Sequence, residues 1–459
     1  MCGHRLDELR TSGHIGFVSR ENVAISPFPL TGALQAFEQA GTTIIKTAWP
    51  LPCSRDCFVA DVEAIKIIFN NRHGFQKETQ IYKIISFFGD NIVGVEGDQW
   101  VLHRSIARKS FNERNNALLW HETVSTLEQW FSEWDEKILL SKTQSAIVNI
   151  TPALRDLTLF IIASAGFGMH FDRKTLERPA PGYTMSFGES LFVAIETMIV
   201  KVVTPRWMYQ LPITKLQQSD TAYTELRNYI VDMIAAQRNG KQPASEASKE
   251  AADLFRRLVA ANEEEGAFFL AGHDKVFREA TAVWPDVSVE AEGQWATSSL
   301  SDYNQLEYTL AVFRETLRLF PPVVRTKRDA TSDTALPSRV RDPQTGSWKA
   351  AQVAVPAALY WGEDVSHFRP ERFTDTADYQ WPRDAWIPFT AGPRVCLGQR
   401  FSTLESACII ARVVRRYRLL PPPELAGLSR EQQRMKLTKW MPGVTATPGN
   451  VNLVFEPRN

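Results

Sequence analysis

The sequence is short of cysteine, of net charge and of long apolar runs. Its 459 residues include five cysteines, an odd and small number that favours a reducing compartment over a disulfide framework. Lysine plus arginine and aspartate plus glutamate number 52 each, so the net charge gives no reason to expect a nucleic acid partner. The longest nearly apolar stretch, residues 157–169, is shorter than the ~20 residues that cross a bilayer, and it is interpreted as a buried helix.

The first residues also lack the features of a secretion signal. Residues 1–6 read Met-Cys-Gly-His-Arg-Leu, which contains neither an apolar core region nor a cleavage site. Cys53 and Cys57 are four residues apart, but no second ligand pair follows them, so we interpret them as free thiols. The chain is 44% hydrophobic, which is enough to bury a large core.

Apolar periodicity and turn residues predict a mainly helical protein with a minor β-sheet, an α+β fold. No internal repeat or long linker divides the sequence, so we expect one domain over residues 1–459. Strands are expected at 44–49, 56–60 and within 328–355, and again at the end of the chain. Helices are expected at 62–70 with Asp61 as N-cap, 116–239 with breaks at prolines, 251–284, 304–319 and 399–417.

Residues 389–398 carry the most specific pattern, Phe-x-x-Gly-x-Arg-x-Cys-x-Gly. Each fixed position has a chemical reason if Cys396 is a thiolate bound to haem iron. Gly392 and Gly398 let the loop bend tightly enough to turn backbone N–H groups toward the sulfur. Arg394 lowers the thiol pKa and can pair with a haem propionate, while Phe389 shields the sulfur from water. The alternative is an ordinary buried cysteine in a turn rich in glycine and proline.

With this pattern the chain resembles the cytochrome P450 family, the haem-thiolate monooxygenases. The resemblance implies the family's fold, haem b, dioxygen as co-substrate, a small apolar organic substrate and electrons from an NADPH-dependent flavoprotein reductase. Arg394, where other members have histidine, resembles the eukaryotic microsomal branch. That branch implies the cytoplasmic side of the endoplasmic reticulum membrane. This chain begins downstream of the usual membrane anchor, so a cytoplasmic location is the alternative.

A second motif, Glu315-x-x-Arg318, places a carboxylate and a guanidinium on one face of a helix. Alone, such a pair is usually a solvated surface contact of little energetic value. The later segment Phe-Arg-Pro-Glu-Arg-Phe at 368–373 changes this interpretation, because the family joins this helix to a later arginine in a buried triad. By resemblance, Glu315, Arg318 and Arg372 support the loop that presents Cys396 and take no part in the chemistry.

Three further residues are expected to contact haem propionates. Trp100 and Arg104 match the family's Trp-x-x-x-Arg helix, and their four-residue spacing puts them on one face. The alternatives are a core tryptophan and a surface cation. Arg325, just after Pro-Pro-Val-Val at 321–324, is another propionate candidate, and its alternative is an arginine at a strand edge.

On the distal side the sequence departs from the family. Residues 269–274 match the family's central helix, and Asp274 would be the catalytic proton relay, but Lys275 follows it where the family has threonine. The resemblance therefore implies missing segments near 274–275 and near 357–360. The main hypothesis is an active monooxygenase. The alternative is a catalytically impaired haem-binding variant without the distal threonine.

Two other features leave alternatives open. The basic run at 412–418 predicts a solvated face at a helix C-terminus, or a docking surface for an acidic electron donor. By resemblance, the segments 88–95, 187–200 and 443–447 form the variable walls of the substrate pocket.

Overall fold

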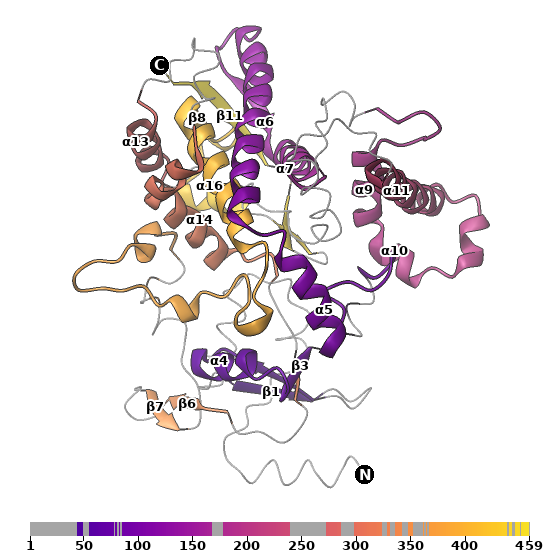
Figure 1. The fold of residues 1–459 in the computed structure, drawn as a ribbon. Coiled ribbons are helices and arrows are strands. Elements are labelled where there is room, and N and C mark those ends of the chain that lie inside the picture. Colours follow the sequence, from indigo (N-terminus) through magenta and orange to yellow (C-terminus); the bar gives the residue numbers. More distant parts are fainter. Residues whose placement is uncertain are drawn as a thin grey trace. The chain divides into compact units, whose positions relative to one another are not determined.

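Helices make up most of the computed structural model, as the sequence predicts (Figure 1). The structure describes residues 44–48, 55–77, 79, 82, 85–167, 178–238, 272–285, 298–323, 328–330, 336–341, 348–351, 361, 364, 367–437, 440–442, 446–449 and 451–458. The α-helices are α4 (Val62–Asn70), α5 (Gly97–Arg108), α6 (Glu113–Leu139), α7 (Ile150–Phe167), α9 (Phe187–Glu196), α10 (Met198–Val203), α11 (Thr214–Arg238), α13 (His273–Val283), α14 (Glu307–Leu319), α16 (Gln399–Arg416) and α17 (Arg430–Leu437). Short 3-10 helices are η2 (Arg206–Gln210), η5 (Leu300–Gln305), η6 (Pro370–Phe373), η7 (Arg383–Ala385), η8 (Gly392–Arg394) and η9 (Pro423–Leu425).

The strands form small antiparallel sheets. They are β1 (Ile44–Ala48), β2 (Arg55–Val59), β3 (Phe75–Lys77), β4 (Ala146–Asn149), β5 (Arg328–Ala330), β6 (Ser338–Arg341), β7 (Trp348–Ala351), β8 (Tyr417–Leu420), β9 (Trp440–Pro442), β10 (Ala446–Pro448) and β11 (Asn452–Pro457). β1 pairs with β2, β3 with β5, and β6 with β7, while β4, β11 and β8 form a three-stranded sheet in that order. The predicted α+β fold class is confirmed.

Internal contacts divide the chain into two compact units. The first contains Met1–Lys77, Ala311–Cys396 and Pro442–Ala446, and the second contains Glu78–Leu310, Leu397–Met441 and Thr447–Asn459. Each unit is assembled from segments far apart in the sequence. The expectation of one domain over the whole chain stays a prediction.

In the first unit, α4 begins where the sequence predicts. The carboxylate of Asp61 accepts a hydrogen bond from the backbone N–H of Ala64 at 2.9 Å, which satisfies a donor that the first helical turn leaves open. The preceding residues form the predicted pair of strands, β1 and β2. Sequence and structure agree here because the capping residue and the turn signals are local.

The core of the second unit is built around α16, which packs against α6 and α13 (Figure 1). Aromatic rings join these helices to the three-stranded sheet. Trp134 of α6 lies 5.1 Å from the ring of Phe455 and 5.9 Å from that of Tyr417, in edge-to-face contacts. Among the described residues, every helix is too short or too polar to span a bilayer.

Two expectations for the second unit were wrong in part. The prolines were expected to break one helical region, but Pro152 lies inside the first turn of α7, where its missing N–H costs nothing. The short strand β4 before it was missed. The basic run at 412–418 is not a solvated face, because Arg412 is fully buried with its guanidinium 4.7 Å over the ring of Trp284, and Arg416 pairs with Asp135.

Candidate active site

Cys396 lies half-buried at the end of a tightly closed loop in the first unit. Its backbone N–H donates to the carbonyl of Phe389 at 3.0 Å, and the N–H of Val395 donates to the carbonyl of Gly392 at 3.0 Å. The hydroxyl of Thr390 donates to the carbonyl of Arg394, also at 3.0 Å. These bonds fold residues 389–396 back on themselves, so the loop has a defined shape without help from a regular helix or strand.

Gly392 is the tightest point of this loop. Its φ of +67° lies in the left-handed region, which favours glycine. A Cβ there would lie 2.5 Å from the backbone oxygen of Phe69, in α4. The loop therefore packs directly on the backbone of α4, and only a residue without a side chain permits this approach.

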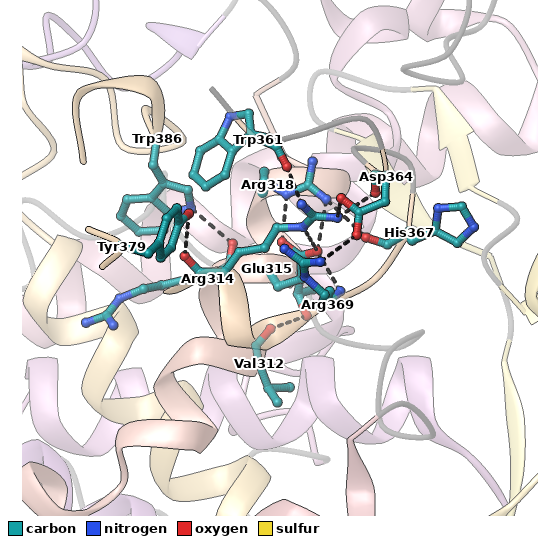
Figure 2. Close-up of polar contacts among 12 residues, drawn as sticks. Val312, Arg314, Glu315, Arg318, Trp361, Asp364, His367, Arg369, Tyr379 and Trp386 are labelled. Carbon is teal, nitrogen blue, oxygen red and sulfur yellow. Dashed lines mark hydrogen bonds and ion pairs between the residues drawn. The ribbon is translucent and has the colours of Figure 1, made fainter. Parts of the chain in front are cut away.

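A cluster of aromatic side chains connects the cysteine loop to α14. The indole N–H of Trp386 donates to the carbonyl of Arg314 in α14 at 3.0 Å (Figure 2). The ring of Trp386 lies 5.8 Å from that of Phe389 and 6.2 Å from that of Phe373. Phe373 belongs to a buried cluster with Trp361 and Ala311. The start of the cysteine loop is thus fixed to α14 on one side and to this cluster on the other.

The carboxylate of Glu315 is the polar centre of the same unit. It is fully buried and accepts two hydrogen bonds from Arg318, at 2.6 and 2.9 Å, and a third from the backbone N–H of Arg369 at 2.8 Å (Figure 2). The two-pronged contact is the strong geometry for an arginine and a carboxylate. Glu315 therefore joins α14 to the segment that leads into η6.

Arg372 is buried beside this pair, but most of its contacts are to another segment. Its guanidinium donates to the backbone carbonyls of Trp361 and Asp364, and one nitrogen lies 2.7 Å from the carboxylate of Asp364. Among the described residues its Nε has no hydrogen-bond partner, and it lies 3.6 Å from Glu315 Oε1. Burial alone would raise the pKa of Asp364, but hydrogen bonding and charge from Arg372 outweigh it and hold that pKa below its ordinary value.

The structure thus brings together Glu315, Arg318 and Arg372, as the sequence predicts. It adds three contributors that sequence reasoning missed: Trp361, Asp364 and the backbone of Arg369. All three contribute a backbone group to these contacts, which no residue pattern reports. The tryptophan at 386 had a sequence signal, since it lies three residues before the predicted loop and indole N–H groups seek partners when buried.

Trp100 and Arg104 lie on one face of α5, in the second unit. Trp100 is buried, and the guanidinium of Arg104 lies 5.5 Å from the centre of its ring. The predicted spacing is therefore seen as a direct contact between the two side chains. Arg394, at the end of η8, is half-buried. Gly398 is buried and precedes the first residue of α16.

Asp274 lies in the first turn of α13, where its side chain is 90% exposed. It lies 3.7 Å from the guanidinium of Arg458 and 3.6 Å from the ring of His273. Residues 269–271, which precede this helix, lie outside the described residues, as do Arg325 and residues 357–360. The relay role of Asp274 and the propionate role of Arg325 stay predictions.

The donor set around the loop fits a haem iron. Within the described residues, no three His, Cys, Asp or Glu side chains gather into a group that could hold a metal ion. One cysteine on a glycine-bent loop would suit a metal that is held by its own macrocycle and needs a single ligand from the protein. The close packing of the loop on α4 at Gly392 and the half-buried sulfur are the features of this chain that match such a ligand.

Comparison with known proteins decides the family. A model of the family "Cytochrome P450" matches residues 54–276 and 273–444. The chain belongs to the cytochrome P450 family. Cytochrome P450 monooxygenase 124 of Postia placenta is 31% identical over 480 aligned positions, covering 92% of this chain and 87% of that relative.

More distant relatives agree. Echinocystic acid 23-monooxygenase of Saponaria officinalis is 26% identical, covering 78% of this chain and 73% of its own length. A crystal structure of a cytochrome P450 (CYP102L1) superposes with a TM-score of 0.69 at 18% identity, covering 94% of this chain and 98% of that one. That likeness shows the fold.

As a cytochrome P450, this protein is a haem-thiolate monooxygenase. It binds haem b, receives electrons from a redox partner and inserts one atom of dioxygen into an organic substrate. The alternative of a catalytically impaired variant gains no support from these relatives.

Proposed function

We propose that Cys396 is the axial thiolate ligand and that residues 386–398 are built to present it. The observation that carries this is the double attachment of the loop, to Phe69 through Gly392 and to Arg314 through Trp386. When bound, haem supplies the activation of dioxygen. The chain's own part is to hold the sulfur at a fixed point, with the ring of Phe389 limiting the access of water.

The remaining site residues take supporting roles in this proposal. Trp100, Arg104 and Arg394 pair with the haem propionates, and Arg325 is a further partner on the resemblance alone. Glu315, Arg318 and Arg372 fasten α14 to the segment before the loop, supported by the buried two-pronged contact and the 3.6 Å ion pair. Their effect on catalysis is through the position of Cys396.

Oxygen labelling tests the proposed reaction. The haem-loaded protein is supplied with electrons by a reductase under ¹⁸O₂, with lauric acid as the probe, because a hydroxylated fatty acid keeps the inserted oxygen atom. We expect one labelled oxygen atom transferred for each turnover and none in the Cys396→Ala variant. Label taken from water would contradict the proposal.

The electron donor is proposed to be an NADPH-dependent flavoprotein reductase. The surface of α5 supports this, because Arg108 and Lys109 are exposed there beside the exposed apolar side chains of Val101, Leu102 and Ile106. Cations beside an apolar patch suit an acidic protein partner.

We also propose that the protein lies on the cytoplasmic surface of the endoplasmic reticulum membrane. The segment from α10 to α11 supports this: Val202, Val203 and Trp207 are 49%, 69% and 63% exposed, and residues 197–219 contain no aspartate or glutamate. Replacing Val203 and Trp207 with serine should reduce flotation with phosphatidylcholine–phosphatidylserine vesicles. Leu139→Ser, which alters an exposed leucine on α6, should not.

The missing segments belong to this proposal as well. Two observations support them: the family match consists of two pieces that meet at residues 273–276, and the alignment with the Postia relative spans 480 positions against 459 residues in this chain. We propose a single cytochrome P450 domain with shortened segments near 274–275 and 357–360.

Asp274 can be tested in the same assay. A proton relay at this position predicts that Asp274→Asn lowers the product formed per NADPH, whereas the matched variant Arg458→Gln does not. The 90% exposure of Asp274 and its position beside Arg458 favour a surface contact, so we expect both variants to keep the coupling of the parent protein.

A further inference from the structure

One carboxylate on α11 holds the segment that leads into α9. Oε1 of Glu225 accepts hydrogen bonds from the backbone N–H and the hydroxyl of Thr184, at 2.9 and 2.7 Å. Its Oε2 accepts a third bond from the backbone N–H of Met185 at 2.8 Å. These donors lie in the two residues that precede Ser186, the N-cap of α9.

The same face of α11 continues the attachment one and two turns further along. The hydroxyl of Tyr229 donates to the carbonyl of Met185 at 2.9 Å and accepts from the N–H of Ala180 at 3.1 Å. The hydroxyl of Tyr183 donates to the carboxylate of Asp232 at 2.5 Å, and its ring stacks on Tyr229 at 3.9 Å. Residues 225, 229 and 232 recur at helical spacing, so together they form one binding edge for residues 180–186.

This edge determines how α9 begins. Ser186 caps the helix by accepting from the N–H of Glu189 at 3.1 Å, and the next residue, Phe187, is buried with its ring 5.9 Å from that of Tyr229. The far end of α9 is also fixed to α11, because the hydroxyl of Tyr223 donates to the carbonyl of Ala194 at 2.8 Å. α9 therefore lies along α11 with both of its ends attached (Figure 1).

Tyr223 connects a second segment to the same helix. The rings of Phe87 and Phe88 lie 4.7 and 6.3 Å from the ring of Tyr223. Two of the segments predicted to form pocket walls, 88–95 and 187–200, thus contact one side chain of α11. A displacement of α9 along α11 would therefore change the distance between these two predicted walls.

We propose that Glu225 is a positioning residue for substrate recognition: by fixing residues 180–186 on α11, it sets where α9 lies and so the affinity for an apolar substrate. Glu225 does this without touching the substrate. The inference rests on the proposed function, and it deepens that function by naming what fixes one wall of the substrate site.

The protonation state of Glu225 agrees with this role. Burial would raise the pKa of its carboxyl group, but the hydrogen bonds from the hydroxyl and N–H of Thr184 and the N–H of Met185 outweigh it and lower the pKa. Glu225 is therefore a carboxylate at neutral pH, with both oxygens available as acceptors. A glutamine there would turn an N–H group toward one of the three donors.

The test compares Glu225→Ala and Glu225→Gln with Glu136→Gln in the haem-loaded protein. Glu136 is an exposed glutamate on α6, outside the segments assigned to the substrate pocket, so its replacement changes the same charge without releasing residues 180–186. With lauric acid and 7-ethoxycoumarin as probes, we expect Glu225→Ala to raise KM about tenfold and to change kcat less than twofold, the effect of losing roughly one net hydrogen bond's stabilisation of the bound arrangement. Amide hydrogen exchange should accelerate in residues 180–196. Glu136→Gln should match the parent protein.

A purely structural role gives a different result. In that case Glu225→Ala would lower the melting temperature and the haem content while KM for both probes stayed unchanged, and the inference would be overturned. Thr184→Val removes one of the three bonds and keeps the carboxylate, so it should raise KM in the same direction by a smaller factor even if Glu225→Ala fails to fold. Product from the parent protein with unchanged KM in all variants would reject this inference alone. No product from the parent protein with either probe would reject the proposed function as well.

Discussion

Gly392 shows most plainly how a single residue shapes the cysteine loop. Its backbone is in a conformation that residues with a Cβ rarely adopt, and the space for a Cβ is already filled by the backbone of Phe69. Because backbone atoms cannot rotate aside as a long side chain can, the loop itself must move if a methyl group is added. The position of Cys396 depends on the shape of that loop.

We therefore expect Gly392→Ala to destabilise the loop by about 1–3 kcal/mol from backbone strain alone, with a further cost from the contact with Phe69. Haem content and the chemical denaturation midpoint should both fall. Gly427→Ala is the matched control, because that glycine is exposed and nothing lies within 4 Å of its added Cβ. If both variants kept full haem content, the close approach at Gly392 would be irrelevant to the site.

At the scale of elements, α14 is fastened to the chain around η6 by charge. The carboxylate of Glu315 is fully buried, and the arginines beside it, Arg318 and Arg372, have side chains only 8% and 1% exposed. Removing the negative charge would leave two buried cations with less compensation, which is costly in a medium of low dielectric constant.

Glu315→Gln is expected to lower the free energy of unfolding by about 3–5 kcal/mol. Glu307→Gln, an exposed glutamate in the first turn of the same helix, should change it by less than about 0.5 kcal/mol. Urea denaturation followed by circular dichroism measures both. Equal stability of the two variants would show that the buried carboxylate of Glu315 stabilises the protein no more than the exposed carboxylate of Glu307.

His273 joins α13 to two other elements of the second unit. Its ring accepts from the N–H of Leu419 in β8 at 3.2 Å and lies 2.8 Å from a guanidinium nitrogen of Arg458, next to the end of β11. Burial, and then the charge of Arg458, lowers its pKa, although Asp274 acts in the opposite direction. The neutral imidazole is therefore favoured in the folded protein.

A lowered folded-state pKa means that the unfolded chain binds a proton more readily as the pH falls below about 6.5. The stabilisation by neutral His273 is complete above that pH, is lost as the pH falls toward the folded-state pKa, and levels off below it. We expect His273→Gln to reduce the loss of stability between pH 7 and pH 5. His121→Gln, which replaces a histidine with a 73% exposed side chain, is the matched control. An unchanged slope in His273→Gln would contradict this assignment.

The sequence predicted those elements whose signals are local. The Asp61 cap and α4, the Glu315–Arg318 pair on α14, and α16 all followed from residues within a few positions of one another. β4 was missed because its partner β11 lies about 300 residues away, so pairing and not local pattern creates the strand. The burial of Arg412 was missed because Trp284, which covers it, comes from a different segment.

At the scale of the whole molecule, the protein depends on a partner for its electrons. The surface of α5 offers exposed cations next to exposed apolar side chains, and charge beside such a patch mainly governs the rate of encounter. The same surface is the part of the described chain that we assign to a flavoprotein reductase.

Reversing two of these charges tests that assignment. Arg108→Glu combined with Lys109→Glu should raise the KM for the reductase about tenfold at low salt, and the difference should shrink as ionic strength rises. Arg206→Glu together with Lys215→Glu reverses two exposed charges, one in η2 and one in the first turn of α11, and should have no such effect. Equal values for the two double variants would place the reductase elsewhere.

The bond between Cys396 and haem iron can be tested directly by the absorption spectrum of the reduced protein with carbon monoxide. We expect the red-shifted Soret band of a thiolate-ligated haem in the parent protein and in Cys408→Ala, whose cysteine is buried in α16. Cys396→Ala should lose this band. A parent protein that binds haem but lacks the band, or a Cys396→Ala variant that keeps it, would show that Cys396 does not bind the iron.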